Sequence, residues 1–171
     1  MNIFETNEYK FVKELYGDKK AERSQVPYIN HINEGLFVLD LINADLVTKK
    51  AYCLHGVFQS DNDFADRCNL RDYTHLDPEA ILHVIEYRHV ANGFLSKHNL
   101  EINPIDINAG ISYITRDMLI ADKVQNFKDF LQHHMGTHPR SKELYKYFSL
   151  WFQKLGSSKM HNLLKQLKEN G

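Results

Sequence analysis

The sequence predicts an all-α protein of six to eight helices, and three observations lead to this prediction. Apolar residues recur at the three- and four-residue spacing of an amphipathic helix along most of the 171-residue chain. No segment shows a convincing alternation of apolar and polar residues, which is the pattern of a half-buried strand. The breaks between helical segments carry Gly, Pro, Asp or Ser, the usual residues at helix ends. A bundle of helices without a sheet is therefore expected.

The first three helices are expected from their end signals. One helix is predicted over residues 7–16. A second opens at Pro27, because a proline in the first helical turn loses no hydrogen bond, and runs to about Asn43. A third follows Asp45, whose carboxylate can cap it.

The remaining helices follow a long polar stretch. Residues 60–77 are rich in Asp and Asn and are expected to form the longest loop, and long loops in compact domains are often functional. Asp77 and Pro78 together give the cap and first position of a fourth helix. Further helices are predicted over about 106–134 and 139–155, and a last one ends near Glu169.

Composition indicates one globular domain over residues 1–171. Hydrophobic residues make up 43% of the chain and charged residues 25%, which are ordinary values for a globular protein and argue against disorder. No apolar run approaches the roughly 20 residues of a membrane-spanning helix, and the start has no basic, then apolar, leader pattern. Cys53 and Cys68 lack metal-site spacing and are expected to be reduced, packed thiols. We therefore expect a cytoplasmic protein without a membrane partner.

Charge is nearly balanced overall but is unevenly placed. The net charge of -1 predicts no strong binding of nucleic acid. Residues 139–171 nevertheless carry seven Lys or Arg against two acidic residues. This excess is typical of a solvated helix face, and the alternative is a surface that binds a polyanion or a protein partner.

Three positions carry residues that suit metal or acid–base chemistry. His31 lies in the first turn of the second expected helix, and His55 ends an apolar helical segment. Asp122 lies inside a strongly apolar helix, where an unpaired carboxylate is costly. Its partner could be an Arg or Lys, a helix N-terminus or a metal ion. Taken singly, each histidine is more typical of a surface or core residue than of a ligand.

Together, the three positions resemble the HD superfamily, whose order is a His, then a His-Asp pair on the next helix, then an Asp on a later long helix. The resemblance spans residues 23–127 and is closest to the RelA/SpoT-type (p)ppGpp hydrolases. Two stretches carry it besides the segment around His55, namely Ser24-Gln25-Val26-Pro27-Tyr28-Ile29-Asn30-His31 and Ile120-Ala121-Asp122-Lys123-Val124-Gln125-Asn126.

The resemblance implies a compact HD-like bundle with its motif-bearing core over 23–127 and the helices of 139–171 packed on it. It also implies a phosphohydrolase that acts on a nucleotide or a related phosphate ester with one divalent metal, namely manganese, iron or zinc. Carried over, the metal ligands are His31, His55 and Asp122. The implied substrate-binding residues are Arg23, Ser24, Gln59 and Asn126.

The chain departs from the HD pattern after His55. Gly56 stands where the family has the Asp of the pair, and Gln59 and Ser60 stand where it has an acidic pair used in hydrolysis. Neither of the latter side chains can act as a general base. Asp61 and Asp63 lie close by and could substitute, and Asp61 is the candidate catalytic residue. The alternative is a degenerate HD domain, with or without metal, that binds a nucleotide or a protein partner, including a second copy of itself.

Overall fold

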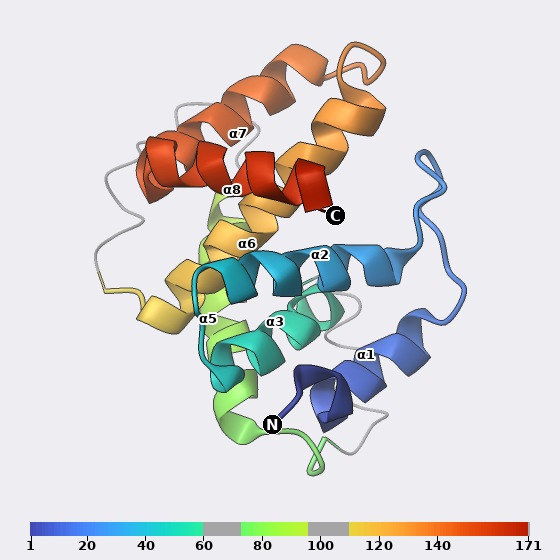
Figure 1. Ribbon diagram of the computed structural model, residues 1–171, viewed down its shortest axis with the longest axis vertical. Coiled ribbons are helices and arrows are strands. Elements are labelled where there is room, and N and C mark those ends of the chain that lie inside the picture. The colour runs from blue at the N-terminus through green and yellow to red at the C-terminus, as the bar shows by residue number, and fades with distance from the viewer. Residues whose placement is uncertain (60–72, 96–109, 171) are drawn as a thin grey trace.

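The computed structural model describes residues 1–59, 73–95 and 110–170, and over these ranges it contains seven α-helices and no β-strand (Figure 1). The all-α prediction is therefore confirmed for the described part of the chain. A 3-10 turn, η1, and a π-helical turn, η3, complete the described elements. In chain order these are η1 (Ile3–Glu5), α1 (Asn7–Tyr16), α2 (Tyr28–Leu41), α3 (Leu46–Phe58), α5 (Pro78–Leu95), α6 (Tyr113–Asp129), η3 (Phe130–His134), α7 (Ser141–Leu155) and α8 (Ser157–Asn170).

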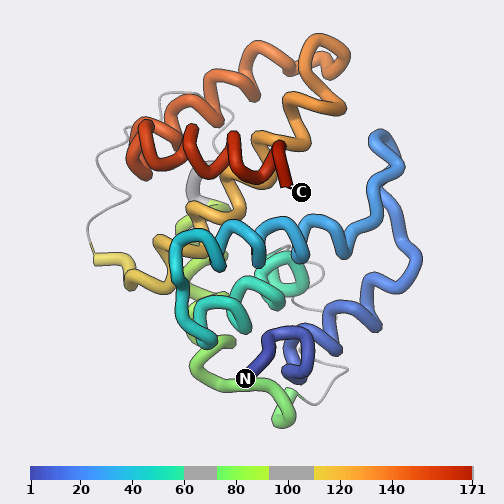
Figure 2. Tube along the Cα trace, in the orientation of Figure 1, coloured from blue at the N-terminus to red at the C-terminus, as the bar shows by residue number. Residues whose placement is uncertain are grey.

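Helices α3 and α6 form the centre of the bundle. Helix α3 contacts α1, α2, α5 and α6, and helix α6 contacts α2, α5, α7 and α8 as well. Helix α2 lies between α8 on one side and α1 and α3 on the other (Figure 2). The core between these helices contains large, fully buried side chains, including Tyr52, Tyr87, Trp151 and Phe152. The C-terminal helices therefore pack on the part of the chain that carries the motifs.

Side-chain caps account for several helix starts. The Asp45 carboxylate accepts a hydrogen bond of 2.8 Å from the backbone of Thr48 at the start of α3, as expected. The Asp77 carboxylate accepts one of 3.0 Å from the backbone of Glu79 at the start of α5. Both caps satisfy amide groups that have no partner inside the helix.

The expectation for the long helix was wrong at its start. A helix was expected from about residue 106, whereas α6 begins at Tyr113. Ser112 caps it by accepting a hydrogen bond of 3.1 Å from Thr115, and Gly110 has a φ of +90°, which does not continue a helix. The expected end is confirmed, because the π-helical turn η3 continues to His134.

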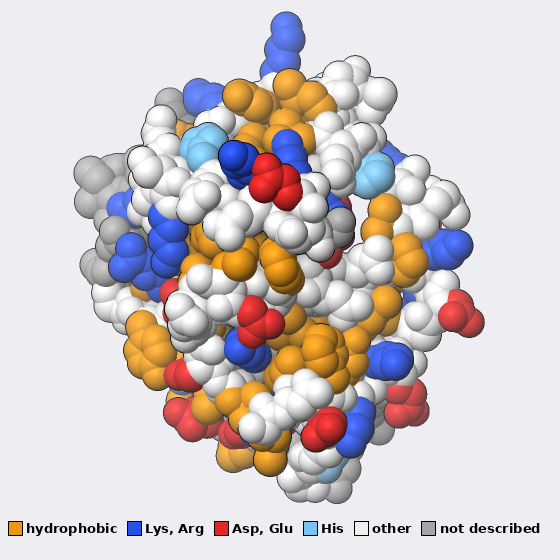
Figure 3. Space-filling model, in the orientation of Figure 1, with side chains coloured by type: hydrophobic (Ala, Val, Ile, Leu, Met, Phe, Trp, Pro, Cys, Tyr) orange, Lys and Arg blue, Asp and Glu red, His pale blue; other side chains and the backbone are white. Residues whose placement is uncertain are grey.

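Within the described ranges, no helix combines the length and apolarity needed to cross a membrane. On the face drawn in Figure 3, Lys and Arg side chains lie among Asp, Glu and apolar side chains. Cys53 is buried as a free thiol, and its burial raises the pKa of that thiol. Cys68 and most of the loop expected over 60–77 lie outside the described residues.

Candidate metal centre

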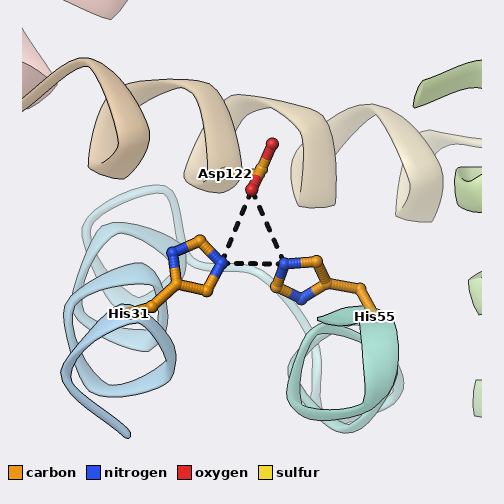
Figure 4. A group of neighbouring side chains, drawn as sticks. All are labelled: His31, His55 and Asp122. Carbon is orange, nitrogen blue, oxygen red and sulfur yellow. Dashed lines mark hydrogen bonds and ion pairs between the residues drawn. The ribbon is translucent and has the colours of Figure 1, made fainter. Parts of the chain in front are cut away.

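Three side chains from three helices converge on one point (Figure 4). His31 comes from the first turn of α2, His55 from the last turn of α3 and Asp122 from the middle of α6. The two Nε2 atoms lie 2.9 Å apart, and each lies 3.5 Å from Oδ1 of the carboxylate. His55 and Asp122 are buried, whereas the His31 side chain is 25% exposed, so the group opens to solvent on the His31 side. This group could hold a metal ion.

A glycine on α2 allows the two histidine rings to meet. A Cβ built at Gly35 would overlap the hydroxyl end of the Tyr52 side chain of α3. Without that Cβ, the Tyr52 hydroxyl lies 3.3 Å from the backbone oxygen of His31, to which it donates. The Tyr52 ring also lies 4.4 Å from the ring of His55. The α2–α3 contact therefore fixes the position of both imidazoles.

Hydrogen bonds on the far side of each ring determine its tautomer. His31 Nδ1 lies 2.5 Å from Oε1 of Gln125, and His55 Nδ1 lies 2.5 Å from the backbone oxygen of Tyr52. The Gln125 amide nitrogen donates to Glu34 at 3.1 Å and to Asp129 at 2.8 Å, which leaves its oxygen facing His31. Both acceptors lack a proton, so both imidazoles carry their proton on Nδ1.

The Nε2 atoms of His31 and His55 consequently face each other and the Asp122 carboxylate, and a neutral ring offers a lone pair there. Burial and the neighbouring His55 lower the pKa of His31, against the opposite effect of Asp122, so the ring stays neutral at neutral pH. Two neutral Nε2 atoms and a carboxylate this close together repel one another unless a proton or a metal ion lies between them. Four-coordinate zinc with bonds of 2.0–2.1 Å places neighbouring ligand atoms about 3.3 Å apart, close to the distances found here. The donor set therefore fits a divalent ion.

The Asp122 carboxylate also has partners that keep it ionised. Its Oδ2 accepts from the Lys123 ammonium at 2.7 Å, and its Oδ1 accepts from the Asn126 amide at 2.6 Å. Burial alone would raise the pKa of this carboxyl, but the neighbouring Lys123 ammonium holds it well below its usual range. Burial and the Asp122 charge together raise the pKa of the Tyr87 hydroxyl, which faces the same carboxylate.

Lys123 is a buried cation held by helix α7. Its ammonium lies 5.0 Å from the centre of the Trp151 ring and 5.8 Å from that of Tyr147. Burial would lower the pKa of Lys123, but the Asp122 carboxylate raises it above its ordinary value. The charges of Lys123 and Asp122 therefore balance, and a divalent ion at the centre would leave a net positive charge.

Most of the predicted site residues border one of two adjoining cavities. A cavity of about 480 Å³ is lined by the three candidate ligands together with Gly56, Gln59 and Asn126. A second cavity of about 480 Å³ is lined by Arg23 and Ser24, and both cavities share Asn126 in their walls. Asp61, the candidate catalytic residue, and Ser60 lie outside the described residues. Seven of the eight predicted residues therefore line one or the other of two cavities that share wall residues.

Sequence reasoning gave no role to Gln125 and Lys123, although both lie in the quoted motif. Gln125 follows Asp122 by three positions, which places both on one helix face, and this spacing could have indicated a shared pocket. Lys123 offered no such signal, because its partners on α7 come from a distant part of the sequence.

Comparisons with known proteins found no relative of this chain. No family model, no curated protein and no solved structure matches it. The resemblance to the HD superfamily therefore rests on the motifs and on the arrangement of His31, His55 and Asp122.

Proposed function

We propose that the protein is a metal-dependent phosphohydrolase that acts on a nucleotide or a related phosphate ester. The observation that carries this proposal is the convergence of two imidazole nitrogens and one carboxylate oxygen at the wall of a cavity. Three protein ligands with open positions are typical of catalytic zinc and iron sites.

His31, His55 and Asp122 would hold the ion, which is manganese, iron or zinc in this proposal. Such an ion lowers the pKa of a bound water and neutralises phosphate charge. Gln125 and the backbone of Tyr52 keep the two imidazoles in the ligating tautomer. Asn126 orients the carboxylate through its hydrogen bond to Oδ1.

The charges around the centre favour an anionic substrate. Because Lys123 already balances Asp122, a bound divalent ion gives the cavity a positive potential. Arg23 and Ser24 line the adjoining cavity and supply a guanidinium and a hydroxyl for the remainder of the substrate. A phosphate ester whose phosphate lies at the centre and whose other end extends toward Arg23 fits this arrangement.

A second candidate is a nucleotide-binding module without turnover. It is favoured by Gly56 and Gln59, which line the metal-site cavity and offer neither a fourth ligand nor a titratable base. A degenerate HD domain of this kind would retain the cavity and bind its ligand without changing it.

Metal content tests the centre itself. Purified untagged protein, reconstituted with manganese, iron or zinc and then desalted, is expected to retain about one equivalent of metal by elemental analysis. Asp122→Asn should retain none, whereas Asp117→Asn, on the same helix but away from the three ligands, should retain as much as wild type. Equal metal content in wild type and Asp122→Asn would contradict the proposed ligand set.

Phosphate release from a panel of nucleotides separates the two candidate functions. Release that requires metal and is lost in His55→Gln supports the hydrolase. Thermal stabilisation by a nucleotide without release supports the binding module, and a ligand at 100 times its Kd adds about 2.7 kcal/mol. Release that persists undiminished in His55→Gln would exclude this site as its source.

A further inference from the structure

Gly56 lies next to His55 and lines the same cavity as the three ligands. A Cβ built at this position would lie 2.7 Å from the hydroxyl oxygen of Tyr16, closer than two such atoms come in real structures. The hydroxyl of Tyr16 therefore occupies the space that a side chain at position 56 would enter. Its distance from that Cβ is similar to the distance between an aspartate Cβ and its own carboxylate oxygens.

Tyr16 is held in this position from outside α3. It is the last residue of α1, and its ring packs edge-on against Tyr28 with 5.7 Å between ring centres. Tyr28 is itself part of the cavity wall. Tyr16 is also among the groups that raise the pKa of Tyr52, after burial and Asp122, which places its hydroxyl near the tyrosine that packs on His55.

We propose that Tyr16 is the fourth protein donor of the metal centre and that its hydroxyl oxygen takes the place of a ligating side chain at position 56. This inference rests on the proposed metal centre. Two imidazoles and one carboxylate leave room for a further oxygen donor in every geometry that suits them. When the phenol oxygen coordinates, its O–H bond breaks and the proton leaves to solvent. Gly56 then contributes to the site, because a Cβ at position 56 would force the Tyr16 hydroxyl to shift.

Titration with cobalt(II) tests this role without any measurement of activity. The intensity of the visible d–d absorption reports the coordination of the ion, and the titration gives its affinity. Tyr16→Phe removes the hydroxyl and retains the ring, and we expect it to weaken cobalt binding by about 10-fold or more and to alter the spectrum. Tyr145→Phe is the matched control, because it removes a hydroxyl from an exposed tyrosine of α7 that lines neither cavity, and it should change neither the affinity nor the spectrum.

Substitutions at position 56 give an independent test. Gly56→Ala should displace the Tyr16 hydroxyl and weaken binding as Tyr16→Phe does, and the two changes together should be no worse than one alone. Gly56→Asp combined with Tyr16→Phe should restore affinity, because a carboxylate then has the space that the hydroxyl occupied. Thermal unfolding of each variant checks that the fold is retained.

The outcomes distinguish this inference from the proposed function. If wild type binds cobalt, Asp122→Asn does not, and Tyr16→Phe matches wild type in affinity and spectrum, then Tyr16 is not a donor and the three-ligand centre stands. If wild type itself does not bind cobalt, the proposed metal centre is wrong, and the role of Tyr16 is wrong with it.

Discussion

At the scale of the residue, Gln125 controls the chemistry of His31 without being a ligand. Its amide oxygen accepts from His31 Nδ1 because its nitrogen is committed to Glu34 and Asp129. Replacing Gln125 with Leu removes the acceptor and frees the imidazole to take either tautomer. We expect metal affinity to fall 10- to 100-fold, the usual effect of losing a partner behind a ligand. Isothermal titration with zinc measures it.

The matched control for this prediction is Gln153→Leu. Gln153 is an exposed residue of α7, so Gln153→Leu makes the same change of side chain at a position away from the site. Equal zinc affinity in the two variants would show that Gln125 does not determine the ligating state of His31.

Lys123 gives a second prediction at this scale, and its two effects have opposite signs. In Lys123→Met the Asp122 carboxylate loses its closest cation while the volume is nearly kept. The metal-free protein should lose about 3–5 kcal/mol of stability, because a buried charge is left with fewer partners. Zinc should bind more tightly, because the positive charge next to the ligand is gone. Urea unfolding with chelator and zinc titration measure the two effects, and weaker zinc binding would contradict the electrostatic argument.

The candidate ligands could be identified from the sequence, but the groups that surround them could not. His31, His55 and Asp122 were found because their residue types and their order along the chain carry the signal, and the structure brings them within 3.5 Å of one another. The contact between Tyr16 and Gly56 joins the end of α1 to the end of α3 and has no pattern in the sequence. Gly56 alone suggested a lost ligand, and only the fold shows what occupies its space.

At the scale of the element, the packing of α2 on α3 determines whether the two imidazoles meet. Gly35→Ala would place a methyl group inside the Tyr52 side chain and push the helices apart. We expect a loss of about 1–3 kcal/mol, the usual cost of overpacking, together with weaker zinc binding. Urea unfolding measures the first effect.

A shorter side chain on α3 provides the control for this prediction. In a Tyr52→Leu background, the methyl group of Gly35→Ala overlaps fewer side-chain atoms of α3, so the loss in free energy of unfolding should be smaller. An equal cost in both backgrounds would mean that Tyr52 is not the group that α2 packs against at this position.

Helix starts could be predicted where a capping side chain close in sequence determines them. The starts of α3 and α5 follow from Asp45 and Asp77, whose carboxylates bond to amides two or three residues ahead. The start of α6 was placed too early, because the cap at Ser112 depends partly on a distant residue. Its hydroxyl and backbone amide both donate to Glu86 of α5, at 2.5 Å and 2.9 Å. That contact joins two helices that only the tertiary fold brings together.

At the scale of the whole molecule, the C-terminal helices pack against the helix that carries Asp122 and so support the candidate metal centre. Helices α7 and α8 bury apolar side chains against α6, and α7 supplies the Trp151 and Tyr147 rings around Lys123. The basic excess over residues 139–171 is compatible with the solvated face expected from the sequence, because Lys142, Lys159 and Lys165 are among its side chains that are partly or fully exposed. A partner on this surface would lie over helices that also hold Lys123 in place.

The stability of the whole metal-free protein should fall as the pH is lowered through the range in which histidine titrates. The pKa of His31 is lowered in the fold, so below its ordinary value of 6.5 the unfolded chain binds a proton that the folded chain does not. The contribution of His31 to the free energy of unfolding is therefore fully present above pH 6.5. It declines as the pH falls toward the folded pKa, by at most about 1.4 kcal/mol per pH unit. Urea unfolding in chelator between pH 7.5 and 5 measures the decline.

The contribution of His31 is isolated by comparing wild type with His31→Gln over the same pH range. The other histidines are present in both proteins, so they contribute equally to the two curves of unfolding free energy against pH. The wild-type curve should therefore be steeper, and the difference in slope is the contribution of His31. Asp122 acts in the same direction at lower pH, since its folded pKa lies well below the ordinary 3.8 and its contribution is lost only in acid. Parallel curves between pH 7.5 and 5 would show that His31 accepts a proton as readily in the fold as in the unfolded chain. The lone pairs would then not converge at neutral pH, and the strongest electrostatic argument for a cation between the two imidazoles would be lost.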